Sequence, residues 1–138
     1  DQYRLYRTYH GCTMAPPVAR ASVALWDDDT TATRNRQLYD QKFAAFVAQL
    51  APVWSLDTPP GAFYLWAKTP YDDVRFTRDL YARQNITVLP GSYLARTAHG
   101  SNPGSGWVRI SLVADVEDCR EAAHRILRFF ETIDINIS

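Results

Sequence analysis

One arginine stands out as a residue that could bind a ligand. Arg109 lies between the apolar residues Val108 and Ile110 and follows a loop rich in glycine. A guanidinium group binds a carboxylate through two parallel hydrogen bonds, a geometry that lysine cannot reproduce. The residues alone leave two roles open: a carboxylate-binding arginine, or an arginine on the exposed face of an edge strand.

Other reactive side chains form no recognisable catalytic set. The sequence contains no G-x-S-x-G, Walker A or H-E-x-x-H motif, and His10, His99 and His124 lie in different segments. His10 and Cys12 have a spacing compatible with metal ligation, but the second pair of ligands that a metal site requires is missing. We therefore predict no catalytic residue and no metal site in this chain.

The composition excludes several classes of protein. The 138 residues can form one domain with a core, and 15 basic and 15 acidic residues give no net charge to attract nucleic acid or an anionic membrane. No apolar segment approaches the roughly 20 residues of a membrane span. The two cysteines form no disulfide framework, which favours the cytoplasm. The chain begins without Met, and we expect it to be part of a longer protein.

Helices are predicted for the first part of the chain. Pro16 and Pro17 suit a helix start, and this helix should end near Trp26. The acidic run 27–29 can cap a second, longer helix. The apolar residues of this helix recur at steps of three and four, as expected for one buried stripe: Tyr39, Phe43, Phe46, Val47 and Leu50.

A strand and a helix should follow the prolines at 59–60. The apolar segment 62–67 is predicted to be a strand buried on both faces. Asp72 and Asp73 can begin a helix that Asn85 ends, with Val74, Leu80 and Tyr81 facing inward.

Two further strands and a closing helix are predicted beyond residue 85. The β-branched segment 86–89 indicates a strand, and residues 93–107 an irregular surface loop. In the strand 107–113, alternation turns Arg109 and Ser111 away from the core. Asp115 and Asp118 resemble a capping pair for a helix with one apolar face, formed by Val116, Cys119, Ala123, Ile126, Leu127 and Phe130.

These elements predict an α/β fold class. We expect a short mixed sheet of three to four strands with helices packed on it, and a long helical segment at the N-terminus.

Four segments in succession resemble one enzyme family, the fold-type I aminotransferases. Residues 6–17 (YRTYHGCTMAPP) are similar to the segment after the family's cofactor-binding lysine, and residues 61–66 (GAFYLW) to the first strand of its small domain. Residues 88–95 (VLPGSYLA) and 108–112 (VRISL) resemble the strand and loop before the substrate arginine and the arginine strand itself. The closest resemblance is to the bacterial succinyldiaminopimelate aminotransferases.

The resemblance implies roles for particular residues. Arg109 corresponds to the arginine that holds the substrate α-carboxylate, and Gly91 and Ser92 are weaker candidates for substrate binding. Tyr9 and His10 correspond to a segment that reaches the neighbouring subunit's active site, so they are candidates for side-chain recognition across a dimer. Alternatively, Tyr9 and His10 could have only a packing role at the interface between the two domains.

The resemblance also implies what this chain lacks. Such enzymes bind pyridoxal phosphate through a lysine of a large domain, and neither Lys42 nor Lys68 stands in a similar sequence context. No cofactor-binding residue is therefore expected here. The full-length homodimer would transfer an amino group from N-succinyl-L,L-diaminopimelate to 2-oxoglutarate in lysine and diaminopimelate biosynthesis. Residues 1–26 would link to the large domain and residues 27–138 would form the small domain.

Two other interpretations remain open from element order alone. The chain could be a non-catalytic module that binds an amino acid or regulates another protein, or a purely structural dimerisation domain. In the structural case Arg109 would form an ion pair instead of facing an open cleft.

Overall fold

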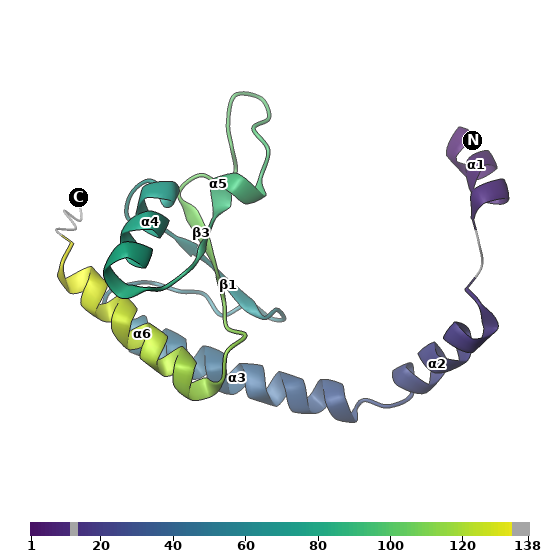
Figure 1. The fold of residues 1–138 in the computed structure, drawn as a ribbon, viewed down its shortest axis with the longest axis horizontal. Helices are drawn as coiled ribbons and strands as arrows, with labels where there is room; N and C mark the ends of the chain where they lie inside the picture. The colour runs from purple at the N-terminus through teal and green to yellow at the C-terminus, as the bar shows by residue number, and fades with distance from the viewer. Residues whose placement is uncertain (12–13, 134–138) are drawn as a thin grey trace. The chain divides into compact units, whose positions relative to one another are not determined.

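The structure is a computed structural model that describes residues 1–11 and 14–133 (Figure 1). The chain divides into two compact units, Asp1–Arg36 and Gln37–Ser138. We call them the N-terminal unit and the C-terminal unit and describe each by itself. No helix in these residues is long and apolar enough to cross a membrane.

The N-terminal unit consists of helices. Helix α1 (Gln2–His10) was not predicted, whereas α2 (Pro16–Trp26) has the predicted bounds. Asp28 accepts a hydrogen bond from the backbone of Thr30 (2.9 Å) at the start of α3 (Thr30–Leu50), which confirms the predicted acidic cap. Neither α1 nor α2 contains a buried residue.

The C-terminal unit is built on a three-stranded sheet. Its order is β1 (Tyr64–Lys68), β3 (Trp107–Ser111), β2 (Leu89–Pro90), and both pairings are antiparallel. The α/β fold class is confirmed, but the sheet is antiparallel and not mixed. The reason is topological: β1 and β2 run in the same direction, and β3 lies between them.

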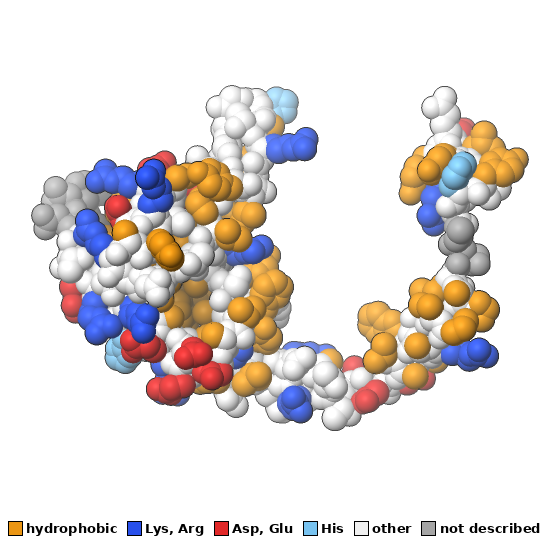
Figure 2. All heavy atoms as spheres, in the orientation of Figure 1, with side chains coloured by type: hydrophobic (Ala, Val, Ile, Leu, Met, Phe, Trp, Pro, Cys, Tyr) orange, Lys and Arg blue, Asp and Glu red, His pale blue; other side chains and the backbone are white. Residues whose placement is uncertain are grey.

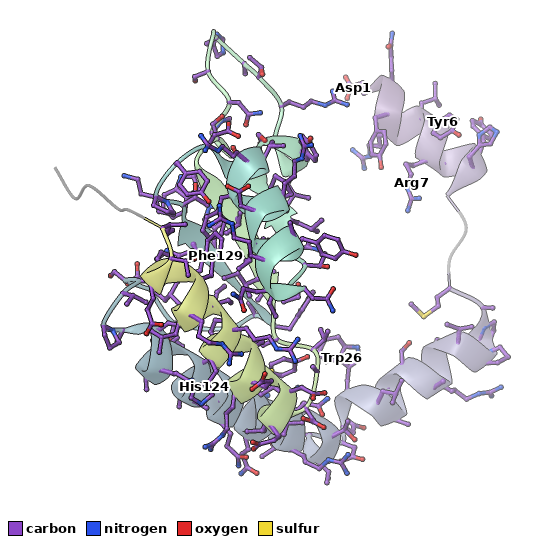
Figure 3. All side chains as sticks on the ribbon, turned by 60° about the vertical axis from the view of Figure 1, so that its left-hand side comes forward. Asp1, Tyr6, Arg7, Trp26, His124 and Phe129 are labelled. Atoms are coloured by element: carbon purple, nitrogen blue, oxygen red, sulfur yellow. The ribbon has the colours of Figure 1, made fainter. Side chains whose placement is uncertain are left out.

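One face of this sheet packs against helices. The buried residues of β1 and β3 share a core with α3, α4 (Asp73–Gln84) and α6 (Val116–Glu131). Figure 3 shows Phe129 between α6 and α4, and His124 on the outer side of α6. Phe76 is the centre of an aromatic cluster, with ring centroids 5.4 to 6.1 Å from those of Trp54, Tyr71, Phe129 and Phe130.

The opposite face of the sheet is only partly covered by the described residues. Leu65 and Ala67 of β1 are buried, whereas Trp66 between them is 39% exposed. The prediction of a strand buried on both faces is therefore wrong. An all-apolar strand cannot reveal which of its faces the chain itself covers.

The ends of the helices follow the sequence closely. Asp72 accepts the Arg75 amide (2.8 Å) and Asp115 accepts the Asp118 amide (2.9 Å), while Asn85 ends α4 in a left-handed conformation (φ 54°). The inward face of α4 differs from the prediction in one residue. Tyr81 is 57% exposed, because it lies about 100° around the helix from the buried Leu80, and Phe76 is buried instead.

Two segments near the sheet differ from the predictions. Of the strand expected at 86–89, only Leu89 belongs to the observed strand, β2. Residues 85–87 and 110–112 instead line a pocket of about 170 Å³, together with residues of α3 and α6. The loop after the short helix α5 (Gly91–Leu94) projects from the sheet (Figure 1). It is not wholly irregular: Ala98 and Ser101 exchange backbone hydrogen bonds of 2.9 and 3.1 Å. His99 and Gly100 form the turn between them with positive φ angles, as a type I′ turn requires.

Candidate carboxylate-binding site

Arg109 occupies the centre of the partly covered face of the sheet. It lies on the middle strand, opposite Trp66 of β1 and Leu89 of β2, and directly opposed residues share one face. Its neighbours Val108 and Ile110 are buried on the other face, as the alternation predicts. The alternative of an edge strand is wrong, because β3 is paired on both sides.

Among the described residues, the guanidinium group of Arg109 has an aromatic neighbour and no carboxylate partner. Its Cζ atom lies 5.7 Å from the centroid of the Tyr64 ring, a cation–π arrangement. Its Nε atom is buried and makes no hydrogen bond. In residues 1–11 and 14–133, the ion pairs involve other arginines: Arg75, Arg125 and Arg128. The charge of Arg109 is therefore available to an external anion.

Aromatic rings flank the arginine on this face. The rings of Trp66 and Trp107 are stacked, with centroids 6.2 Å apart and planes 7° from parallel. Gly91 borders the pair: a Cβ atom added there would lie 2.8 Å from the Trp66 ring. The surface beside Arg109 is thus rich in aromatic side chains.

A buried carboxylate ties together the loop ends next to this surface. Asp73 accepts hydrogen bonds from the backbone N–H of Ser92 (2.9 Å) and of Gly106 (3.2 Å). Burial acts to raise the pKa of Asp73, but the Ser92 hydroxyl beside the carboxylate, together with these backbone hydrogen bonds, outweighs burial and holds the pKa below its usual value. From sequence, Asp73 was expected only to start a helix, and its contacts span distant segments that no local pattern reveals.

The remaining candidate residues lie in two different environments. Gly91 is buried, and so is the Ser92 hydroxyl, which lies beside the Asp73 carboxylate. Tyr9 and His10 are exposed on α1 in the N-terminal unit, where the His10 ring stacks on Tyr6 (4.5 Å). The proposed partner of His10 in metal ligation, Cys12, lies outside the described residues, within which no cluster of three potential metal ligands occurs.

The two lysines differ in their availability. Lys42 is buried, and its Nζ donates hydrogen bonds to the carbonyl groups of Leu112 (3.2 Å) and Val113 (3.4 Å) beyond β3. The same ammonium group lies 4.8 Å from the Tyr39 ring centroid. Lys68 is exposed at the end of β1. Lys42 is therefore occupied by interactions that hold α3 against the end of β3.

The comparison with protein families decides what kind of molecule carries this site. The family model described as aminotransferase class I and II matches residues 2–126. The chain belongs to this family. The match includes all three strands of the sheet and therefore Arg109.

Solved structures and curated relatives agree with this assignment. An aminotransferase from Neisseria meningitidis is 46% identical, with a TM-score of 0.83 over 94% of this chain and 33% of its own. The LL-diaminopimelate aminotransferase of Nitratidesulfovibrio vulgaris is 32% identical over 75% of this chain and 26% of its own. A probable N-succinyldiaminopimelate aminotransferase from Thermus thermophilus is 34% identical, with a TM-score of 0.55 over 67% of this chain and 24% of its own.

The chain spans about a quarter of the length of the curated relatives it matches. Enzymes of this family depend on pyridoxal phosphate.

Proposed function

We propose that Arg109 binds the α-carboxylate of the substrates in a pyridoxal-phosphate aminotransferase of which this chain is the C-terminal part. The observation that carries the proposal is the position of its guanidinium group: central on a partly covered sheet face, with no carboxylate partner in the part of the chain that the structure describes. An unpaired arginine in such a position is a ready-made receptor for a carboxylate.

In this role Arg109 would both bind and orient. Two parallel hydrogen bonds to the α-carboxylate fix its plane, and with it the direction of the neighbouring Cα–H bond. The Tyr64 ring restricts the guanidinium from one side, so less entropy is lost when substrate binds. The rings of Trp66 and Trp107 would exclude water from one side of the bound carboxylate.

The cofactor-binding groups would belong to the rest of the enzyme. Pyridoxal phosphate, when bound, serves as an electron sink for the substrate α-carbon. Within the described residues, Lys42 does not fit its covalent attachment, because its ammonium group is buried against two carbonyl groups. Lys68 is exposed but lacks the sequence context of the family's lysine. We therefore assign the lysine and the phosphate ligands to a large domain of the same polypeptide.

For the substrate we propose N-succinyl-L,L-diaminopimelate, with 2-oxoglutarate as amino acceptor, in lysine and diaminopimelate biosynthesis. The relatives that act on LL-diaminopimelate and N-succinyldiaminopimelate support this choice. Tyr9 and His10 would recognise the substrate side chain across a homodimer, with Gly91 and Ser92 closer to Arg109. We propose a cytoplasmic location for the enzyme.

The test is the variant Arg109→Lys in the full-length enzyme. Loss of a bidentate charged hydrogen bond, about 1.5 to 3 kcal/mol, should raise the KM for glutamate and the succinylated substrate about 10- to 100-fold. Cofactor absorbance should be unchanged. Arg78→Lys, on the exposed face of α4, is the matched control and should leave both KM values unaltered. Unchanged KM values for Arg109→Lys would refute the assignment.

A further inference from the structure

We infer that Asp73 is a positioning residue for Arg109: its carboxylate fixes β2 against β3 and thereby sets where the guanidinium group points. The inference rests on the proposed function for its effect on substrate binding. Its structural part can be tested separately on the chain itself.

The Asp73 carboxylate joins two segments that flank the arginine. Ser92, whose N–H it accepts, lies just after β2, and Gly106, whose N–H it also accepts, lies just before β3. The carbonyl group of Gly106 in turn accepts a hydrogen bond from Thr69 (2.8 Å), just after β1. One side chain that is only 1% exposed therefore links the ends of all three strands.

The pairing of β2 with β3 is too short to fix itself. The ladder consists of Leu89 opposite Arg109 and Pro90 opposite Val108, and proline has no backbone N–H to donate. β1, by contrast, pairs with β3 along five residues. The two hydrogen bonds to Asp73 supply, on the β2 side, the constraint that the ladder lacks.

Close packing between Gly91 and Gly104 transmits a movement of the segment before β3 to β2. Gly91 and Gly104 touch through their backbones, so a Cβ atom on either would collide with the carbonyl oxygen of the other. Asn102 donates to the Ser92 carbonyl (2.9 Å) and accepts from the Gly104 amide (2.9 Å). If the carboxylate is lost, a shift of the segment before β3 toward Gly91 must displace β2, which lies directly beside Arg109.

The test compares two adjacent aspartates in the full-length enzyme: Asp72, which caps α4, and Asp73, its first residue. Asp73→Asn keeps the size of the side chain but turns an NH₂ group toward a backbone N–H. Asp72→Asn makes the same chemical change at the exposed helix cap, where asparagine is as good as aspartate. Because a misplacement of about 1 Å can cost about 100-fold in rate, we expect Asp73→Asn to lower kcat/KM at least about tenfold for both carboxylate substrates, mainly through KM.

The outcomes separate positioning from stability. A variant that merely unfolds lowers the amount of active enzyme, and so kcat, without altering KM. Raised KM values for Asp73→Asn, with cofactor absorbance intact and Asp72→Asn like the wild type, support the inference. Equal KM values for the two variants overturn it.

A separate measurement distinguishes failure of this inference from failure of the proposed function. Unchanged KM values for Arg109→Lys would refute the proposed function. The structural role of Asp73 is then tested by backbone amide hydrogen exchange in the 138-residue chain. Faster exchange along β3 in Asp73→Asn than in Asp72→Asn supports the constraint on the strand. Identical exchange rates in the two variants overturn it.

Discussion

The two units of this chain use their apolar residues in opposite ways. In the C-terminal unit they form a buried core, whereas the N-terminal unit buries none of the side chains of α1 or α2. Hydrophobic side chains instead cover the surface of these two helices, as Figure 2 shows in orange. The exposed residues include Tyr3, Leu5, Tyr6, Tyr9, Val18, Val23, Leu25 and Trp26.

This difference indicates that the C-terminal unit is stabilised by contacts within the chain and the N-terminal unit is not. Isolated helices as short as α1 and α2, of 9 and 11 residues, are marginal in water, and most helical stability comes from packing of an apolar face. The C-terminal unit has that packing within the chain. The N-terminal unit displays an apolar surface of the kind that marks an interface.

The largest expected effect comes from removing an aromatic ring from the core. Phe76→Ala should destabilise the C-terminal unit by about 3 to 5 kcal/mol, because it leaves a cavity at the centre of the aromatic cluster. Tyr3→Ala, which removes an exposed ring from α1, should change the free energy of unfolding by less than about 0.5 kcal/mol. Urea unfolding measures both, and similar losses for the two variants would contradict the division.

A smaller effect is expected from adding a methyl group where two backbones meet. Gly91→Ala should cost about 1 to 3 kcal/mol, because its Cβ would collide with the carbonyl oxygens of Gly104 and Trp107. Gly11→Ala creates a similar collision, with the carbonyl oxygen of Arg7, but in a unit without a core. We expect its unfolding midpoint to match the wild type. If Gly11→Ala proved the more destabilising variant, α1 would have to be part of the cooperative core.

The smallest effect on stability should come from deleting the first two helices. A chain that starts at Asp28 retains the cap of α3, and its free energy of unfolding should lie within about 0.5 kcal/mol of the full chain. We also expect the full chain to self-associate through the exposed aromatic residues and the truncated chain to be monomeric. Sedimentation across micromolar concentrations tests this, and a monomeric full chain would remove the interface interpretation.

Local chemistry made much of the fold predictable. Asn85 and Asp115 act within a few residues of themselves, so their capping roles could be read from sequence, as could the outward direction of Arg109. Contacts between distant segments could not. The carbonyl partners of Lys42 lie about 70 residues away, and the second role of Asp73 depends on two loops that only the folded chain brings together.

Two features of the structure could not be predicted from the sequence pattern: the central position of β3 in the sheet and helix α1. The pattern of alternation could not distinguish a central strand from an edge strand, and only the pairing of β3 on both sides did so. Helix α1 was missed because its residues mix aromatic and charged side chains without a buried stripe. A short helix without buried residues needs contacts with other residues to be stable, and its own sequence does not predict those contacts.

The contact between Gly91 and Gly104 limits how this loop can diverge among related sequences. A side chain at either position would collide with the backbone of the other glycine. Because the obstacle is backbone, no change of residue type at the second position can relieve the collision. In a saturation library the two positions should both return glycine, while Gly61, with open space around it, should accept many residues. Variation in this loop is then expected at its projecting end, residues 98–101, with the contact between Gly91 and Gly104 kept intact.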